Sequence, residues 1–471
     1  MSANSVESEP LRLSRRELEI AGLVAEGLTN REIAGRLFIS ERTVDGHLEH
    51  VREKLGVNTR AQIAAWVVRH DMVSHETATA RPVSRPDQGR RGIARHRTLI
   101  AGAVLLAIAL ALVVAILGLR PSPTFPPGPI ITTIAGTGSL SQGTFGGYSG
   151  DGSFAIHAEL SRPSDIAAGR DGIYVDDYGN GAVRLIGRNG RIRTVAGGGT
   201  ALLADGATAT AVSLGYASKL AVDDQGRLYL LTNLAGSLEV WMLRSDSTMA
   251  RIVSLGASSG GGPPALFQPV GGLALAKDGT MYIADRAENR VWKRTPDGTV
   301  SIYAGTGQAG YSGDLGSARS AQLNWPIGLA VDQDNLYIAD SGNHRIRKVN
   351  IVSGVITTVA GSSSQYGDGG DGGIATQARL SFPYGVAVGR DGTLFIADTG
   401  NNRVREVTPA GRIEALAGTG RSGFKGDGGP ASQAELSGPT ALSLDISGQD
   451  LLLADTDNHR VRELPLLLKH G

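Results

Sequence analysis

One uninterrupted apolar stretch limits how the rest of this chain can fold. TLIAGAVLLAIALALVVAILGL, residues 98–119, contains no charged residue and lies between Arg97 and Arg120. At about 1.5 Å of rise per residue, a helix of this length measures about 33 Å, against a hydrocarbon layer of about 30 Å. Buried helices of soluble proteins are usually shorter and carry a polar stripe. We therefore predict a single transmembrane helix over residues 98–119.

The flanking charges predict the orientation of this helix. Arginines crowd its N-terminal side, whereas beyond Arg120 no Lys or Arg occurs before Arg162. Basic flanks stay on the cytoplasmic side of a membrane. A cleaved signal peptide fits less well, because no small-residue cleavage pattern follows the stretch. We expect a single-pass protein of the cell membrane with a cytoplasmic N-terminus and an extracytoplasmic C-terminal part.

The amino-acid composition limits which structures and reactions are possible on either side of the apolar stretch. The 471 residues include 66 glycines, concentrated after the apolar stretch, and no cysteine. Such a glycine content is typical of turn-rich β structure. The absence of cysteine excludes disulfides, zinc-thiolate sites and thiol nucleophiles. The net charge of +1 does not by itself indicate nucleic-acid binding.

The segment before the membrane contains repeated helix-start signals. The S/T-x-x-E/Q spacing of a capping box occurs at Ser14 and Glu17, Thr29 and Glu32, and Thr59 and Gln62. Ser40 is a suitable N-cap for one more helix. The pattern predicts an all-α, four-helix domain over residues 11–72. A short helix followed by a longer one, about 29–55, has the proportions of a helix-turn-helix, although a plain helical hairpin fits the same pattern.

The longer helix is amphipathic. Four apolar residues at helical spacing are expected to form its core stripe: Val44, Leu48, Val51 and Leu55. The opposite face is expected to carry Arg42, Asp45, Gly46, Glu49 and Arg52.

The run LSRRELEIAGLVAEGLTNREIAGRLFISERTVDGHLEHVREKLGVNTRAQ resembles the LuxR-type helix-turn-helix domain, through its G-L-[ST]-N-[KR]-E-I-A and T-V-x-x-H-x-x-x-[IV]-x-x-K-L-G-V signatures. The resemblance implies binding to double-stranded DNA, and homodimerisation through the last helix, about residues 60–70. It places on the recognition surface Arg42, Thr43, Asp45, Gly46, Glu49, Arg52 and Lys54.

Two of these residues depart from the family pattern. Asp45 and Glu49 stand where the family usually has basic residues. Carboxylates repel phosphates, although one aimed at a base edge can accept a hydrogen bond from cytosine N4. We expect weak DNA binding by a monomer. Solvated surface charge is the alternative role for both side chains.

Two segments join the domains to the membrane helix. Residues 73–97 are rich in Arg, Ser, Pro and Thr without apolar periodicity, and we expect a basic, disordered cytoplasmic linker. Residues 120–129 form a Pro-rich spacer, which is expected to be stiff.

Residues 130–471 contain one unit repeated about every 50 to 60 residues. Its copies are IYVDDYGNGAVRLI (173–186), LYLLTNLAGSLEVWML (228–243), MYIADRAENRVWKR (281–294), LYIADSGNHRIRKV (336–349), LFIADTGNNRVREV (394–407) and LLLADTDNHRVREL (451–464). Four expected strands per copy and six copies predict an all-β, six-bladed propeller. The first strand, ITTIAG (131–136), has no blade of its own and is expected to close the ring as the outer strand of the last blade.

The repeats resemble NHL repeats through Y-I-A-D-x-G-N-x-R-[IV]-R and the loop G-Y-S-G-D-G. The resemblance implies a binding surface for peptides, proteins or glycans at the channel mouth. Within the repeats we expect structural ion pairs around turns whose Gly and Asn adopt positive φ: Asp285 with Arg290, Asp340 with Arg345, Asp398 with Arg403, and Asp455 with Arg460.

The loops 147–152, 310–315, 366–373 and 424–429 are rich in Asp and Gly. They lack the ladder of carboxylates that a calcium loop requires, so we expect turns and no metal, and no cofactor elsewhere. His344 and His459 lie inside the repeated motif, and we assign them no catalytic role.

The whole pattern predicts a membrane-anchored, one-component transcription regulator that is not an enzyme and senses an extracytoplasmic ligand. Two alternatives stay open: an extracytoplasmic propeller enzyme of lyase or hydrolase type, and an adhesion scaffold with a vestigial helix-turn-helix. The sequence identifies neither the ligand nor the operator, nor the direction of regulation.

Overall fold

The computed structural model of the 471-residue chain contains two separate compact units, within residues 1–124 and 125–471. In the first, the structure describes residues 13, 15–25, 28–30, 33, 44, 48–49, 51–52, 54–55, 57, 60, 62–64 and 67; in the second, 128–139, 146–215, 218–234, 236–257, 271–362 and 366–466. The predicted linker (73–97) and transmembrane helix (98–119) lie outside these residues. No helix within the described ranges is long and apolar enough to cross a membrane.

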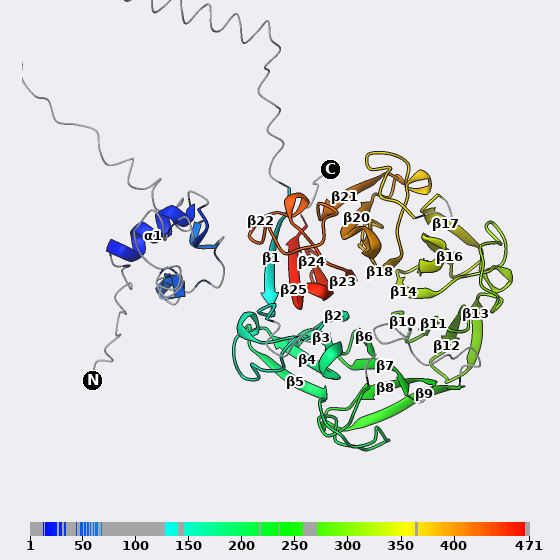
Figure 1. Ribbon diagram of the computed structural model, residues 1–471. Helices are drawn as coiled ribbons and strands as arrows, with labels where there is room; N and C mark the ends of the chain where they lie inside the picture. The colour runs from blue at the N-terminus through cyan, green and yellow to red at the C-terminus, as the bar shows by residue number, and fades with distance from the viewer. Residues whose placement is uncertain are drawn as a thin grey trace, which may run out of the picture. The chain divides into compact units, whose positions relative to one another are not determined.

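The N-terminal unit is helical. Helix α1 (Arg15–Ala25) is followed by further helical residues up to position 67, and the amide of Ile33 donates to the carbonyl of Thr29 at 2.9 Å, as expected where a helix begins near Thr29 (Figure 1). The apolar side of α1 packs against residues from the later helical segments. The most buried members of this core are Ile20, Ala21, Val24, Ile33, Val44, Leu48, Val51 and Ile63.

The C-terminal unit consists of six antiparallel sheets arranged around a central channel, which confirms the predicted six-bladed propeller (Figure 1). We number the blades in chain order. The strands of each blade are given from the innermost outward. Blade 1 consists of β2 (Asp165–Gly169), β3 (Gly172–Asp177), β4 (Ala182–Gly187) and β5 (Ile192–Gly197), and blade 2 of β6 (Ser218–Val222), β7 (Leu228–Leu234), β8 (Ser237–Leu243) and β9 (Met249–Ala257). Blade 3 consists of β10 (Gly271–Leu275), β11 (Met281–Asp285), β12 (Arg290–Arg294) and β13 (Val300–Ala304).

Blades 4 to 6 follow the same order. Blade 4 consists of β14 (Pro326–Val331), β15 (Asn335–Asp340), β16 (Arg345–Asn350) and β17 (Ile356–Ala360), and blade 5 of β18 (Pro383–Val388), β19 (Leu394–Asp398), β20 (Arg403–Val407) and β21 (Ile413–Ala417). Blade 6 consists of β23 (Pro439–Leu444), β24 (Asp450–Asp455) and β25 (Arg460–Pro465), with β1 (Ile130–Ala135) as its outer strand. Short 3-10 helices lie in the connections: η1 (Ala155–His157), η2 (Tyr178–Asn180), η3 (Ala318–Ser320), η4 (Ser341–Asn343), η5 (Ala375–Gln377), η6 (Thr399–Asn401), η7 (Ala431–Gln433) and η8 (Thr456–Asn458).

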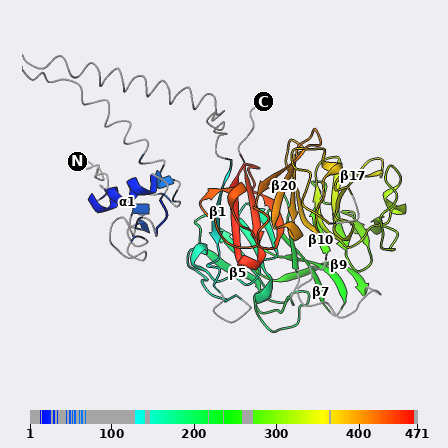
Figure 2. The same ribbon diagram turned by 45° about the horizontal axis from the view of Figure 1, so that its top comes forward.

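The ring closes between the two ends of this unit. Strand β1 pairs antiparallel with β25, with Thr132 opposite Glu463, and its outer edge pairs with the short strand β22 (Gly429–Pro430). In Figure 2 the cyan β1 lies beside the red C-terminal strands. Ile131 is fully buried in the core of the last blade. The predicted closure by an N-terminal outer strand is therefore confirmed.

Apolar side chains fill the space between neighbouring blades. The second and third strands of each blade are rich in aliphatic residues, which pack across to the next sheet. Between blades 3 and 4, for example, Tyr282 and Val291 share a buried cluster with Leu336 and Ile338. Because packing continues from sheet to sheet around the ring, the unit has a core without any disulfide.

Candidate functional site

The predicted recognition helix is described only in part. Val44, Leu48 and Val51 are buried in the helical core and Leu55 packs partly against it. Glu49 is exposed on the other side of the helix. The remaining predicted DNA-contacting positions Arg42, Thr43, Asp45 and Gly46 lie outside the described residues.

Arg52 and Lys54 make contacts within the helical unit. The Nε of Arg52 donates to the carbonyl of Leu48 at 3.2 Å, and the rest of the side chain is half-buried. The Nζ of Lys54 lies 2.7 Å from the buried carboxylate of Glu17 in α1. Because about a third of the Lys54 side chain stays exposed, this contact does not decide whether Lys54 also lies on the DNA-binding surface, as predicted. A buried carboxylate needs a cation nearby, so Lys54 joins two helices of the fold.

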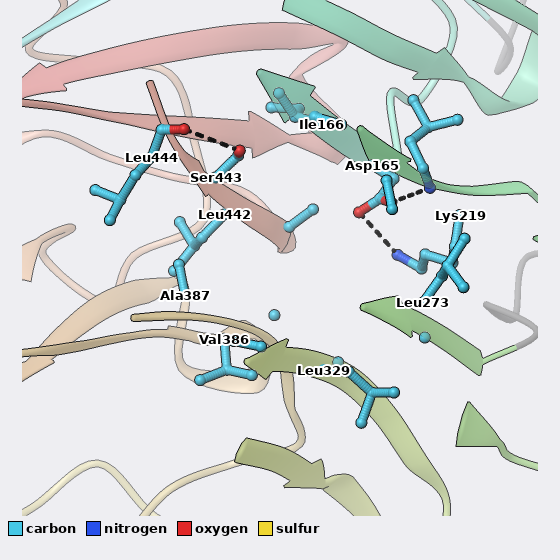
Figure 3. Close-up of a pocket in the computed structure, with 18 of the residues that line it drawn as sticks. Asp165, Ile166, Lys219, Leu273, Leu329, Val386, Ala387, Leu442, Ser443 and Leu444 are labelled. Atoms are coloured by element: carbon cyan, nitrogen blue, oxygen red, sulfur yellow. Dashed lines mark hydrogen bonds and ion pairs between the residues drawn. The ribbon is translucent and has the colours of Figure 1, made fainter. Parts of the chain in front are cut away.

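The innermost strands of all six blades line one cavity of about 260 Å³. Most of its wall is aliphatic or glycine, because the strands approach closely around the axis. Figure 3 shows its residues, with Leu273, Leu329, Val386 and Leu442 on different strands. Its polar groups come from Asp165, Lys219, Tyr384, Thr440 and Ser443.

Asp165 and Lys219 form the charged pair of this cavity. Their Oδ1 and Nζ atoms lie 3.4 Å apart, and the second carboxylate oxygen accepts the amide of Leu220 at 2.7 Å (Figure 3). The Lys219 ammonium also donates to the carbonyl of Ser164 at 3.2 Å. Burial raises the pKa of Asp165, and Lys219 opposes that shift. Sequence analysis missed this pair, because no repeat marks it.

The turn aspartates are bound differently from the prediction. Asp340 lies opposite Arg345 across β15 and β16, yet its ion pair, 3.4 Å long, is with Arg347. Arg345 instead donates to the carbonyl of Gly361 and covers the ring of Tyr311 at 3.8 Å from its centroid. The same correction applies to Arg403 and Arg460. Aspartate pairs with the arginine seven residues later in four blades: Asp177 with Arg184, Asp340 with Arg347, Asp398 with Arg405, and Asp455 with Arg462.

Each of these four arginines is fully buried between two carboxylates. The second carboxylate comes from the Asp of a Gly-Asp loop: Asp151, Asp314, Asp371 or Asp427, at 2.6 to 3.1 Å. The inner aspartate also accepts bonds from an Asn side chain and a backbone amide, as Asp340 does from Asn343 and Asn324. Burial nevertheless raises the pKa of each inner aspartate to about 6. The aspartates of these loops therefore hold the buried arginines in place through ion pairs.

Blades 2 and 3 lack this arrangement. Trp241 and Trp292 take the place of the buried arginine, directly after the same bulge in the third strand. Thr232 takes the place of the inner aspartate in blade 2. In blade 3, Trp292 Nε1 donates to Asp285 at 3.4 Å, while Arg290 lies 3.9 Å from Glu288. The predicted pair of Asp285 with Arg290 is thus replaced as well.

The turn geometry agrees with the expectation in part. Positive φ falls on the residue directly before the arginine, which is an asparagine in two of the predicted turns, Asn289 and Asn402, and a histidine in the other two, His344 (φ 55°) and His459. Gly342 is required for space, because a Cβ there would lie 2.6 Å from the Asn324 side chain. His344 Nδ1 accepts the amide of Phe382 in the next blade at 3.1 Å, and His459 Nδ1 accepts that of Arg162 at 3.0 Å. Burial, then neighbouring arginines, lower the pKa of both histidines.

Metal binding finds no support in the described residues, where no cluster of three or more His, Asp or Glu side chains is arranged to hold an ion. The acids of the Gly-Asp loops are directed at arginines. The histidines of the repeats act as hydrogen-bond acceptors between blades.

Comparison with known proteins finds a family match within each unit. Residues 11–67 match the bacterial regulatory proteins of the luxR family, and residues 323–349 and 380–406 match the NHL repeat. The oxygen regulatory protein NreC of Staphylococcus aureus (strain MRSA252) is 39% identical over 67 residues, which cover 14% of this chain and 31% of NreC. The N-terminal unit is therefore a LuxR-type helix-turn-helix domain.

The propeller has more distant relatives. The chloroplastic protein SUPPRESSOR OF QUENCHING 1 of Arabidopsis thaliana is 29% identical over 194 residues, 40% of this chain and 18% of that protein. A solved protein of unknown function from Bacteroides thetaiotaomicron superposes with a TM-score of 0.53 at 20% identity, over 72% of this chain and 76% of its own. The chain spans less than a third of the length of each of these two sequence relatives, and the structural match concerns the fold alone.

Proposed function

We propose that this chain, which joins a LuxR-type DNA-binding domain to a six-bladed NHL-repeat propeller, is a membrane-anchored, one-component transcription regulator. The observation that carries the proposal is the luxR-family match over residues 11–67, on a helical unit whose stripe Val44, Leu48 and Val51 is buried. The apolar run at 98–119, with arginines before it, supports a single membrane crossing.

DNA binding is assigned to the cytoplasmic side. The exposed Glu49 reduces the attraction to phosphates, and Lys54 shares its charge with Glu17, so these two positions add little to the binding of the DNA backbone by a monomer. Two copies bound to adjacent half-sites double the number of contacts. The active species is therefore a homodimer on DNA.

The propeller is assigned to sensing on the extracytoplasmic side, by binding and not by catalysis. The ionisable pair in its channel is already engaged, since Asp165 accepts from Lys219 and from the Leu220 amide. A ligand, peptide or glycan reaching the propeller changes either dimerisation or cleavage within residues 73–97, because a lone helix transmits poorly by tilting. Equal dimerisation and no cleavage with and without the propeller count against both routes.

Topology is tested with single cysteines, since the chain has none of its own. Val352→Cys, at a side chain 90% exposed on the propeller, is expected to react with a membrane-impermeant maleimide in intact cells. Gln88→Cys, in the linker, is expected to react only after lysis. The reverse pattern, or recovery of the protein without membranes, contradicts the anchored arrangement.

DNA binding is tested on membranes that contain the full chain. Thr43→Ala and Arg52→Ala are expected to abolish retention of operator DNA. Arg170→Ala, an exposed arginine of the propeller, is the matched control and leaves retention unchanged. Retention that survives both helical variants favours the adhesion scaffold instead.

A further inference from the structure

One repeated hydrogen bond links each of blades 4, 5 and 6 to the blade that follows it in the ring. A hydroxyl directly after the turn aspartate donates to the proline carbonyl at the start of the next blade. The pairs are Ser341 with Pro383, Thr399 with Pro439, and Thr456 with Pro163, at 2.6 to 2.7 Å. In blade 3 the corresponding residue is Arg286.

Arg286 is a cation without an anion. Its guanidinium carbon lies 4.6 Å from the centroid of the Trp325 ring. Its buried Nε has no hydrogen-bond partner, which is also true of Arg184, Arg405 and Arg462, but unlike those three it forms no ion pair with a carboxylate among the described residues. Burial lowers the pKa of Arg286, and the Tyr384 hydroxyl is the group that opposes this shift. Arg286 is only partly buried, so a cation without a carboxylate partner at this position is available to an external anion.

Trp325 offers a flat apolar surface beside this cation. Its side chain is 43% exposed, and its backbone has φ 52° although it precedes Pro326. A bulky residue before proline disfavours that conformation. It is held there by the Asn289 side chain, which accepts the Trp325 amide at 2.9 Å. The same pre-proline conformation recurs at Arg162, Phe382 and Gly438, so it belongs to the scaffold of the blades and fixes the position of the indole.

Arg286 and Trp325 come from neighbouring blades. Arg286 follows β11 in blade 3, and Trp325 precedes β14 in blade 4.

Another arginine at this mouth shows the contrast. Arg162 occupies the pre-proline position of blade 1 that corresponds to Trp325 and also has positive φ, at 50°. Its guanidinium lies 2.8 Å from the carboxylate of Asp457. Arg162 is therefore paired internally, whereas Arg286 has no carboxylate partner among the described residues.

We infer that Arg286 and Trp325 form a binding site for an organic carboxylate attached to a flat ring. The guanidinium takes the carboxylate through two parallel N–H···O bonds, and the ring packs on the exposed part of the indole. This inference names the ligand class of the proposed sensor and so rests on the proposed function for its biological role. Binding itself requires only the propeller.

The test uses the full-length protein in detergent and the probe benzoate, with the neutral isostere benzamide as its control. Calorimetric titration is expected to show benzoate binding at least tenfold tighter than benzamide. Arg286→Gln and Trp325→Ala each weaken benzoate binding at least tenfold. Arg319→Gln, an exposed arginine in η3, leaves it unchanged.

Thermal unfolding separates loss of the site from loss of the fold. Because Arg286 pairs with no carboxylate among the described residues and its side chain contacts the Trp325 ring, Arg286→Gln is expected to unfold within a few degrees of the wild type. Absent benzoate binding, equal binding of benzamide, or retained affinity in a folded Arg286→Gln protein overturns the site. DNA retention by membranes in the same samples reports the proposed function separately: its loss alone leaves the ligand site standing.

Discussion

Replacing Arg347 with Met tests how the turn aspartates of the propeller are held. Arg347 is fully buried, lies 2.7 Å from Asp314 and 3.4 Å from Asp340, and donates to the carbonyl of Ser312. Removing one member of a buried ion pair leaves the other charge uncompensated and costs about 3–5 kcal/mol. Arg345→Met is the matched variant. It removes one hydrogen bond and one contact with Tyr311, for a loss of about 1–2 kcal/mol.

The pH dependence adds a second criterion. Burial already raises the pKa of Asp340 to about 6, above the value of 3.8 expected for an unfolded chain. Without Arg347 the carboxyl loses a positive neighbour, so its pKa rises further and the folded variant prefers the protonated acid. The unfolding free energy of Arg347→Met should therefore fall as pH increases from 5 to 8, relative to that of the wild type.

Urea unfolding followed by tryptophan fluorescence measures both effects. Three of the four tryptophans belong to the propeller, so a Trp66→Phe background confines the signal to that unit. An equal loss in the two variants, or a larger loss in Arg345→Met, refutes the assignment of Arg347 as the partner of Asp340.

Three further substitutions test individual contacts in the two units. The His344 imidazole accepts a hydrogen bond in its neutral form, and its pKa is lowered in the folded protein. The unfolding free energy of the wild type should therefore drop relative to that of His344→Asn as pH falls below about 6.5. Urea titrations that give the same difference in unfolding free energy at pH 7.5 and 5.5 argue against this. Ile131→Ala should lower the unfolding free energy by about 2–5 kcal/mol. In hydrogen exchange, the amides of β25 should lose protection before those of the other blades, because β25 pairs with β1. Equal loss of protection in all blades contradicts closure of the ring through β1. Glu17→Gln should destabilise the helical unit by roughly 1–3 kcal/mol, read from circular dichroism at about 222 nm during heating, and an unchanged midpoint removes Lys54 from the fold-stabilising contacts.

Sequence reasoning succeeded where a pattern recurs. Six copies of a strand motif are enough to predict six blades, because each copy must bury the same faces against its neighbours. The strand at 131–136 had no blade of its own, and ring closure left a single place for it. The aspartates were also identified as structural, since a residue repeated in good blades serves the scaffold.

Sequence reasoning failed where contacts depend on twist and on neighbouring loops. Asp340 and Arg345 flank one turn, so proximity in sequence favoured them as partners. The bulge after Ile346 shifts the register of β16 against β17, and Arg347 lies between Asp340 and Asp314. Asp314 is more than thirty residues away in the chain, and no local pattern connects them. Arg286 was missed for the opposite reason, because it breaks the repeat.

The measurement that tests the central claim most directly is genome-wide mapping of the DNA bound by the full-length protein in intact membranes, repeated with residues 120–471 deleted. A membrane-anchored regulator predicts a limited set of enriched sites whose occupancy changes when the propeller is removed. An absence of enriched sites in both forms contradicts transcriptional regulation. Enriched sites with identical occupancy in the two forms contradict sensing by the propeller.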